Sequence, residues 1–411
     1  MKWFGRKAVR EPARPFLLRG LWGQAGEPLP RSYEAQVRAA YLGNAVAQRA
    51  VRVVAEALAS VVVDWQRSVP AAAGTPPPSA TRMVPLPEQA RGGLVTSDLL
   101  ESIATHLLLH GNAFVHVAQD GEGMPVRLFA LRPERVKVEP DASGWPASYL
   151  YRAGEAKRRF AVRDGLGRLE VVHIRAQHPL DDHYGLGCLG AAAAAVAVHN
   201  AAGRWNKALL DNAARPSGAL VYQPGDGTVL SAAQFERLRE EMEAQFAGAG
   251  NAGRPLLLDG GLKWQAMSLT PADMDFVALK EAAAREIALA FGVPPMLLGL
   301  PGDNTYANYR EAVRSLWRLT VLPMADKVLG ALGEGLGAWW PGLRLAVDVD
   351  QVSALHGDRA ELWAAVSAAD FLTTEEKREM LGFAASVPSP PSAASPAMQS
   401  SPEPLGGAAH G

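Results

Sequence analysis

The chain has 411 residues, 48% of them hydrophobic, and a formal net charge of −1. This length predicts roughly two to four domains, and the apolar content is ample for a buried core. The mean hydropathy of −0.03 argues against a membrane protein. The single cysteine, Cys188, excludes an internal disulfide framework and fits a reducing compartment.

Residues 1–31 are predicted to form a flexible basic arm. The first twenty residues contain six lysines and arginines and one glutamate. Such a segment is typical of a solvated tail, and contact with nucleic acid or a neighbouring subunit is the other possibility. No apolar segment follows the basic residues, so we do not expect a signal peptide.

The next block, residues 32–185, has a mixed pattern and predicts an α+β domain. Helical spacing between residues 45 and 58 changes to a strand-like VVVDW run, and the Pro-rich stretch 70–91 predicts an exposed loop. Ser97 is expected to cap a helix that Gly111 ends. The strand candidates that follow are 112–120, 126–140, 149–152 and 169–174.

The stretch 185–212 is rich in alanine and predicts one long helix that is apolar on most of its sides. Its small side chains suit close packing against copies of itself, which indicates assembly. Residues 216–268 then predict a small α/β insert with a strand at 219–223, a helix capped by Ser231, and a hairpin around Gly260-Gly261.

The clearest pattern is helix, stiff loop, helix between residues 269 and 329. Thr270 is expected to cap the first helix, and Gly292 followed by two prolines is expected to end it. A second helix is predicted from about Thr305, and Pro323 is expected to kink or break it.

The remaining residues predict one strand and two short helices. The strand is LRLAVDVD at 343–350, and both helices fall within 351–383. From residue 384 the sequence is rich in Pro, Ser and Ala without periodicity, which predicts a disordered tail.

The string IALAFGVPPMLLGLPGDNTYANYREAVRSLWRLTVLP resembles the portal proteins of tailed double-stranded DNA phages. It is most similar to the short-chain branch found in siphophages, prophages and gene transfer agents, because FGVPPMLLG, TYANYREA and TVLP occur in that order. The resemblance covers roughly residues 32–383. It implies a wing (32–185), first stem helix (186–215), clip (216–268), second stem helix (269–292), tunnel loop (293–305), long wing helix with a returning strand (306–350) and helical crown (351–383).

The resemblance also implies a function. Members form a ring of about twelve subunits at one capsid vertex, an arrangement in which each residue is repeated in every subunit. Double-stranded DNA passes through the ring during packaging and ejection. The implied partners are the large terminase, the major capsid protein and a head-completion adaptor. The implied location is the virion, after assembly in the host cytoplasm, with no catalysis, cofactor, metal or membrane.

Two sets of site residues follow from this resemblance. The stem helices and tunnel loop are expected to face DNA, and the clip is expected to bind terminase and the adaptor. The channel candidates are Arg204, Lys207, Lys280, Arg285, Leu300, Asp303, Asn304 and Thr305, and the clip candidates are Arg237, Arg239, Glu240 and Glu243.

Other parts of the sequence leave two further functions open. Gly185, Gly187 and Gly190 spell a dinucleotide motif, so an NAD-dependent oxidoreductase is the alternative, but the motif does not directly follow a strand. His173 and His183 lie near acidic residues at a spacing that fits no common metal site. The sequence contains no Walker A motif, so we do not expect the packaging ATPase itself. A membrane-associated assembly factor is the third hypothesis.

Overall fold

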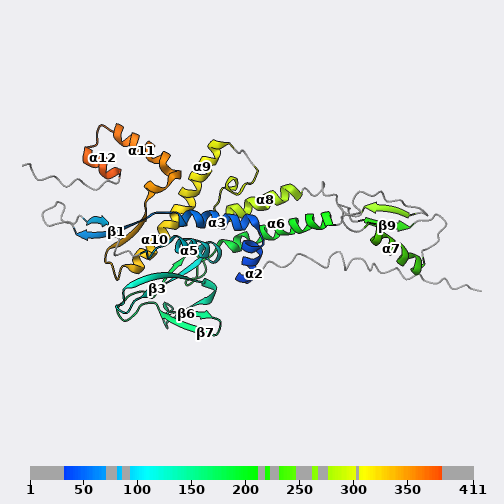
Figure 1. Cartoon of the computed structure of the whole chain (residues 1–411), viewed down its shortest axis with the longest axis horizontal. Helices are drawn as coiled ribbons and strands as arrows, with labels where there is room; N and C mark the ends of the chain where they lie inside the picture. The colour runs from blue at the N-terminus through cyan, green and yellow to red at the C-terminus, as the bar shows by residue number, and fades with distance from the viewer. Residues whose placement is uncertain are drawn as a thin grey trace, which may run out of the picture. The chain divides into compact units, whose positions relative to one another are not determined.

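The computed structural model describes residues 32–70, 81–85, 93–211, 218–222, 231–246, 262–266, 276–301 and 305–381 (Figure 1). The predicted basic arm, the predicted disordered tail and the predicted cap at Thr270 lie outside these residues. The chain divides into two compact units, residues 1–354 and 355–411.

The N-terminal helices of the first unit each begin at a polar cap. The Ser32 and Asn44 side chains accept hydrogen bonds from the second or third backbone N–H of their helices, which would otherwise lack partners. The third cap is Thr96, which accepts from the Leu99 N–H at 3.2 Å, so the prediction of Ser97 was wrong by one residue. Gly111 ends that helix in the left-handed region at φ 81°, as predicted. The elements are α2 (Tyr33–Val37), a π-helical turn (Arg38–Leu42), α3 (Ala45–Ala59) and α5 (Ser97–His110).

Two antiparallel three-stranded sheets follow, in the orders β4-β3-β8 and β5-β6-β7. Phe114 of the first sheet packs with Val138, Tyr149 and Phe160 of the second, and all four are buried. The sequence analysis missed β7, whose AKRRFA sequence is too polar to stand out as a strand. The strands are β3 (Asn112–Gln119), β4 (Pro125–Leu131), β5 (Val136–Pro140), β6 (Pro146–Ala153), β7 (Ala156–Ala161) and β8 (Val171–Arg175).

A third sheet has the order β11-β1-β2. β1 (Val63–Pro70) and β11 (Leu343–Val347) agree with the sequence, whereas β2 (Thr81–Pro85) lies inside the stretch predicted as loop. That prediction was wrong for β2 because its partner β1 supplies the hydrogen bonds, as in the pairing of Arg67 with Val84. Such pairing does not show in local composition.

Four long helices complete the first unit. The N–H of Leu322 donates to the carbonyl of Trp317, five residues earlier, which closes a π-helical turn at Trp317–Val321. This wider turn directly precedes Pro323, which has no N–H to donate, and the helix continues afterwards. The helix was expected to kink or break at Pro323; it does not break there, and the π-helical turn is the irregularity that accompanies the proline. The helices are α6 (Cys188–Asp211), α8 (Phe276–Ala290), α9 (Tyr306–Leu316) and α10 (Leu322–Leu336).

The predicted insert contains β9 (Gly218–Tyr222), α7 (Ala232–Phe246) and β10 (Leu262–Ala266). Ser231 caps α7, since its hydroxyl accepts from the Gln234 N–H at 3.3 Å. β10 pairs with β9, and the other half of the hairpin expected around Gly260-Gly261 lies outside the described residues.

The second unit contains the two predicted short helices, α11 (His356–Ala368) and α12 (Thr374–Met380). Thr373 and Glu376 form a capping box at the start of α12, because each side chain accepts a hydrogen bond from the backbone N–H of the other.

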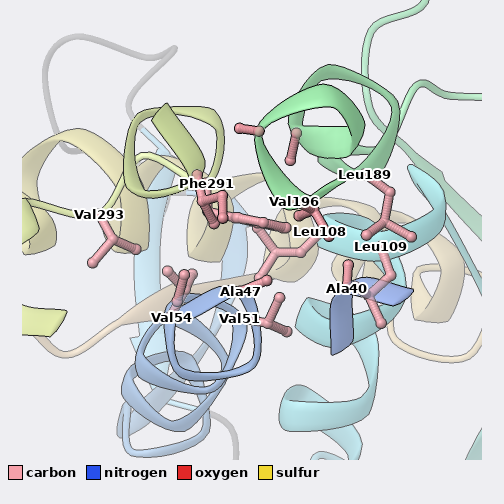
Figure 2. Packing of buried hydrophobic residues seen from close by; sticks show 14 of the residues in the cluster. Ala40, Ala47, Val51, Val54, Leu108, Leu109, Leu189, Val196, Phe291 and Val293 are labelled. Carbon is pink, nitrogen blue, oxygen red and sulfur yellow. The ribbon is translucent and has the colours of Figure 1, made fainter. Parts of the chain in front are cut away.

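The main core of the first unit lies where α3, α5, α6 and α8 meet (Figure 2). Figure 2 shows Val51 and Val54 of α3 with Leu108 of α5, Val196 of α6, and Phe291 just after α8. These side chains are buried, so the N-terminal half of α6 and the C-terminal end of α8 are held in this core.

Candidate functional site

The candidate site is the pair of helices α6 and α8 together with the loop that leads from α8 to α9. α6 and α8 pack side by side (Figure 1). Alanines lie buried on both helices, among them Ala192 and Ala195 of α6 and Ala284 and Ala288 of α8. Because their side chains are small, the two helix backbones can approach closely.

The start of α6 is held by a buried amide, that of Asn112. Its side-chain oxygen accepts the Gly185 N–H at 2.7 Å, and its amide donates to the Gly185 carbonyl at 3.1 Å. The same oxygen lies 3.0 Å from Nε2 of His173. Asn112 is fully buried, so this network fixes the chain leading into α6 to the end of α5 and to β8.

Two of the three glycines of the dinucleotide-like motif, Gly185 and Gly187, are explained by contacts within the protein. A Cβ on Gly185 would lie 2.1 Å from the Gly111 carbonyl oxygen, and one on Gly187 would lie 2.5 Å from the Leu109 carbonyl oxygen. The backbone at the end of α5 therefore packs directly against both glycines. α6 starts at Cys188, three residues later than expected. Gly185 and Gly187 precede it because they pack against the backbone at the end of α5.

A second polar cluster holds the middle of α6. The Asn44 amide donates to Oδ1 of Asn200 at 2.8 Å and lies 3.0 Å from Nδ1 of His199. Asn200 donates in turn to the Ala39 carbonyl at 2.9 Å. Burial lowers the pKa of His199, and the positive charge of Lys280 lowers it further. Lys280 of α8 therefore lies near enough to His199 of α6 for their charges to interact.

The loop after α8 is anchored at its start. Gly292 adopts φ 65°, and its carbonyl accepts a hydrogen bond from the Thr320 hydroxyl at 2.7 Å. Val293 is buried, and the short 3₁₀ turn Pro295–Leu298 packs its leucines against the core. From Gly299, at φ 73°, the described part of the loop is held by hydrogen bonds instead of buried apolar side chains, including the bond from the Leu300 N–H to the Pro295 carbonyl.

The predicted channel residues are spread along this site. Arg204 and Lys207 are exposed on α6, and Lys280 is half-buried on α8. Arg285 donates a hydrogen bond to the Pro301 carbonyl and so joins α8 to the far end of the loop.

The remaining predicted residues belong to the loop and to the insert. Leu300 is half-buried, and Thr305 caps α9 by accepting from the Asn308 N–H at 3.2 Å. Asp303 and Asn304 lie outside the described residues. On α7, Arg237 and Glu240 are exposed, Arg239 pairs with Glu236 at 3.0 Å, and the Glu243 side chain is not described.

The histidines do not assemble a metal site. Within the residues that the structure describes, no group of three or more His, Cys, Asp or Glu side chains could hold an ion. His173 bonds to Asn112, and burial lowers its pKa to about 3. The Nδ1 atom of His178 accepts the Leu180 N–H. The contacts of His173 and His178 are thus hydrogen bonds within the protein.

Sequence reasoning missed the two asparagines that fix α6. Asn44 and Asn112 are the buried polar residues of the described chain. One signal was present, since Asn112 directly follows the cap glycine Gly111 and opens an otherwise apolar strand. Its partner Gly185 is 73 residues away, and no local pattern connects them.

Comparison with known proteins identifies the family. The family model described as phage portal protein matches residues 45–382. The chain belongs to this family. Portal subunits in general have a structural role. Among the helices described in this chain, none is both long enough and apolar enough to cross a membrane.

Several relatives extend this finding. A protein of Rickettsia felis is 40% identical over 287 residues, which are 70% of this chain and 74% of that protein. A probable portal protein of Streptomyces phage phiC31 is 28% identical over 53% of this chain and 47% of its own length. A solved chain from the neck of a native gene transfer agent particle, computed with C12 symmetry, is 44% identical with a TM-score of 0.63, and the match covers 90% of this chain and 99% of that one. An HK97-family portal protein from Corynebacterium diphtheriae has the same fold, with a TM-score of 0.51 at 16% identity over 79% of this chain and 98% of that one.

Proposed function

We propose that copies of this chain form a ring of twelve subunits in the neck of a phage-like or gene transfer agent particle, and that double-stranded DNA passes through this ring. The observation that carries the proposal is the match over nearly the full length of a chain from a C12-symmetric gene transfer agent neck, at 44% identity. The exposed apolar surface of α6 supports it, because Val198 and Trp205 are 40% and 43% exposed on this alanine-rich helix.

In this proposal α6 and α8 line the channel as stem helices. Each cation that faces the lumen is repeated in every subunit, so a few lysines or arginines give a complete belt of charge. Arg204 and Lys207 suit this role because both are exposed on α6. Since phosphate contacts make binding tight and salt-sensitive, a conduit that lets DNA slide should carry few of them.

The tunnel loop narrows the channel in this scheme. Its first half is fixed by Val293 and by the bond between Thr320 and Gly292. We therefore assign the DNA-contacting part to residues 299–305, which include Leu300, Asp303, Asn304 and Thr305. Arg285 limits the movement of this part by holding Pro301.

The insert around α7 is proposed as the clip that binds the large terminase and later the head-completion adaptor. α7 presents both charge signs to solvent through Arg237, Arg239 and Glu240. The wing is proposed to contact the major capsid protein. No part of this function requires catalysis, and an NAD-dependent enzyme is not a second candidate because the glycines at 185 and 187 contact their own chain.

The test is the assembly state of the purified full chain. Native mass spectrometry should find a particle of twelve 43.7 kDa chains, 12 × 43.7 or about 520 kDa, and negative-stain images should show rings. A compact monomer that forms no annular particles at any concentration would overturn the proposal.

A matched pair of variants sharpens this test. Val198→Asp places a charge on the exposed face of α6, whereas Val62→Asp changes an equally apolar side chain that is 50% exposed outside that helix. We expect Val198→Asp to lose the ring without loss of helix content and Val62→Asp to keep it. Rings from both variants would show that α6 does not face a neighbouring subunit.

A further inference from the structure

The small sheet β5-β6-β7 has two chemically different faces. Val138, Tyr149 and Phe160 point into the core and are buried. Because side chains alternate along a strand, the residues between them point to the opposite side. That opposite side carries four cations.

We define the basic face as Lys137, Arg152, Lys157 and Arg159, all of which are exposed. The strand register places Lys137 and Arg159 on either side of Leu150, and it places Arg152 directly opposite Lys157. With strands about 4.8 Å apart and same-face residues about 6.8 Å apart along a strand, the four side chains start within a patch of roughly 10 by 7 Å.

Two carboxylates lie near the four cations: Glu139 is on the face itself, and the exposed Glu155 is in the turn between β6 and β7. In the described part of the chain, Glu139 is the carboxylate that pairs with it, through Arg159 at 2.7 Å. This contact and a hydrogen bond from Ser148 hold the pKa of Glu139 below its usual range. Arg152 and Lys157 lie directly opposite each other on the neighbouring strands β6 and β7. Such a pair of like charges destabilises a sheet. A bound anion would relieve that repulsion.

Protection of a sheet edge is the competing explanation. Charged side chains on an edge strand prevent pairing with other chains, and β7 is an edge strand. Arg152, however, lies on the central strand β6, and Lys137 lies on the opposite edge strand β5. Edge protection can therefore account for Lys137, Lys157 and Arg159, but it does not account for Arg152 or for the gathering of all four cations on one face.

We propose that the basic face binds the phosphate backbone of duplex DNA, on a surface separate from the stem helices. Duplex DNA presents a negative charge about every 1.7 Å along its axis, so one small patch can neutralise several phosphates. Leu150, Ser148 and Glu139 share the face with the cations, and none of them is aromatic. Base stacking is thus absent from this contact, and binding is independent of sequence.

A closed circular duplex separates this surface from the channel, because a preassembled ring cannot thread a closed circle. We would measure binding of the full-length protein to a relaxed, fluorescently labelled DNA circle at 50 and 200 mM salt. Four phosphate contacts predict a loss of about 100-fold in affinity over that range. For Arg152→Gln with Lys157→Gln, binding at 50 mM salt should be weaker, and the loss over the range should fall to about 10-fold.

The control is Arg49→Gln with Arg52→Gln, which removes the same charge from exposed arginines on α3. We expect this variant to bind like the unmodified protein. Equal behaviour of the two variant pairs, or no binding of the circle by the unmodified protein, would overturn the proposal. Poly-glutamate would serve as a competitor for the bound circle. If it displaced the circle as effectively as duplex DNA of equal total charge, the face would be assigned to an acidic protein, and the DNA proposal would be overturned. Ring formation is scored separately by imaging, so failure of either proposal leaves the other standing.

Discussion

The strongest test of the packing argument is removal of the Asn112 side chain. In Asn112→Ala the N–H and carbonyl of Gly185 both lose their partner, and Gly185 is itself buried. Each buried polar group left without a hydrogen bond costs about 1–3 kcal/mol, so we expect a loss of about 4 kcal/mol in the free energy of unfolding. For a unit of this size a change of 1 kcal/mol moves the melting temperature by about 2 °C.

Thermal unfolding of the full chain, followed by circular dichroism, should therefore show a first transition lowered by about 8 °C. The matched control is Gln48→Ala, an exposed position on α3 where a change within about 0.5 kcal/mol is normal. If Asn112→Ala and Gln48→Ala melt within 2 °C of each other, Asn112 does not fix the start of α6 and the reasoning fails.

Three further predictions concern the glycines and histidines. In chemical unfolding, Gly187→Ala should lower the free energy of unfolding by more than about 3 kcal/mol, since its Cβ would lie 2.5 Å from a backbone oxygen of α5. Gly190→Ala should instead raise it by about 0.5–1 kcal/mol, because a Cβ there would have no atom within 4 Å and alanine favours the helix. Burial lowers the pKa of His106 to about 4 and that of His173 to about 3. Both histidines are neutral in the folded state, whereas in the unfolded chain they take up protons below about pH 6.5. The free energy of unfolding should therefore decrease as the pH is lowered, by about 2 kcal/mol per histidine at pH 5. In urea unfolding at pH 7 and pH 5, His106→Leu should remove the part of this decrease that comes from His106. Gly292→Ala should destabilise by at least 1 kcal/mol in the same melts, because φ 65° is strained for alanine and its Cβ would lie 2.9 Å from the Thr320 hydroxyl; an unchanged midpoint would contradict the anchoring of the loop.

Features set by neighbouring residues were predictable from the sequence. Gly111 and Gly292 end their helices in the left-handed region, and Thr305 and Ser231 cap the helices that follow them. A cap needs only a short side chain and the first turn of its own helix, so the signal is local. The order of long helix, α/β insert and long helix followed from such signals together with helical periodicity.

Features set by distant residues were not predictable. β2 exists because β1 offers it an open edge, and β7 because Phe160 packs with Phe114 far along the chain. For both strands the partner that decides the structure lies outside any window in which periodicity is read. The π-helical turn before Pro323 is local, since it is closed between Trp317 and Leu322, but helical periodicity does not distinguish it from an α-helical turn. The candidate channel cations on α6 and α8 could be named from the sequence, but the hydrogen bond from Arg285 to the Pro301 carbonyl could not.

The supports of α6 indicate which part of it is available to other subunits. Asn112 fixes the approach at Gly185, and Asn44 holds the middle at Asn200. Ala202 is the last fully buried α6 residue among the side chains described on this helix. The first half of α6 is therefore part of its own subunit's core, while the last turns project beyond that support. An exposed helix end with apolar side chains gains stability by packing against a neighbour, so the far end of α6 is where contact with the next subunit should contribute most.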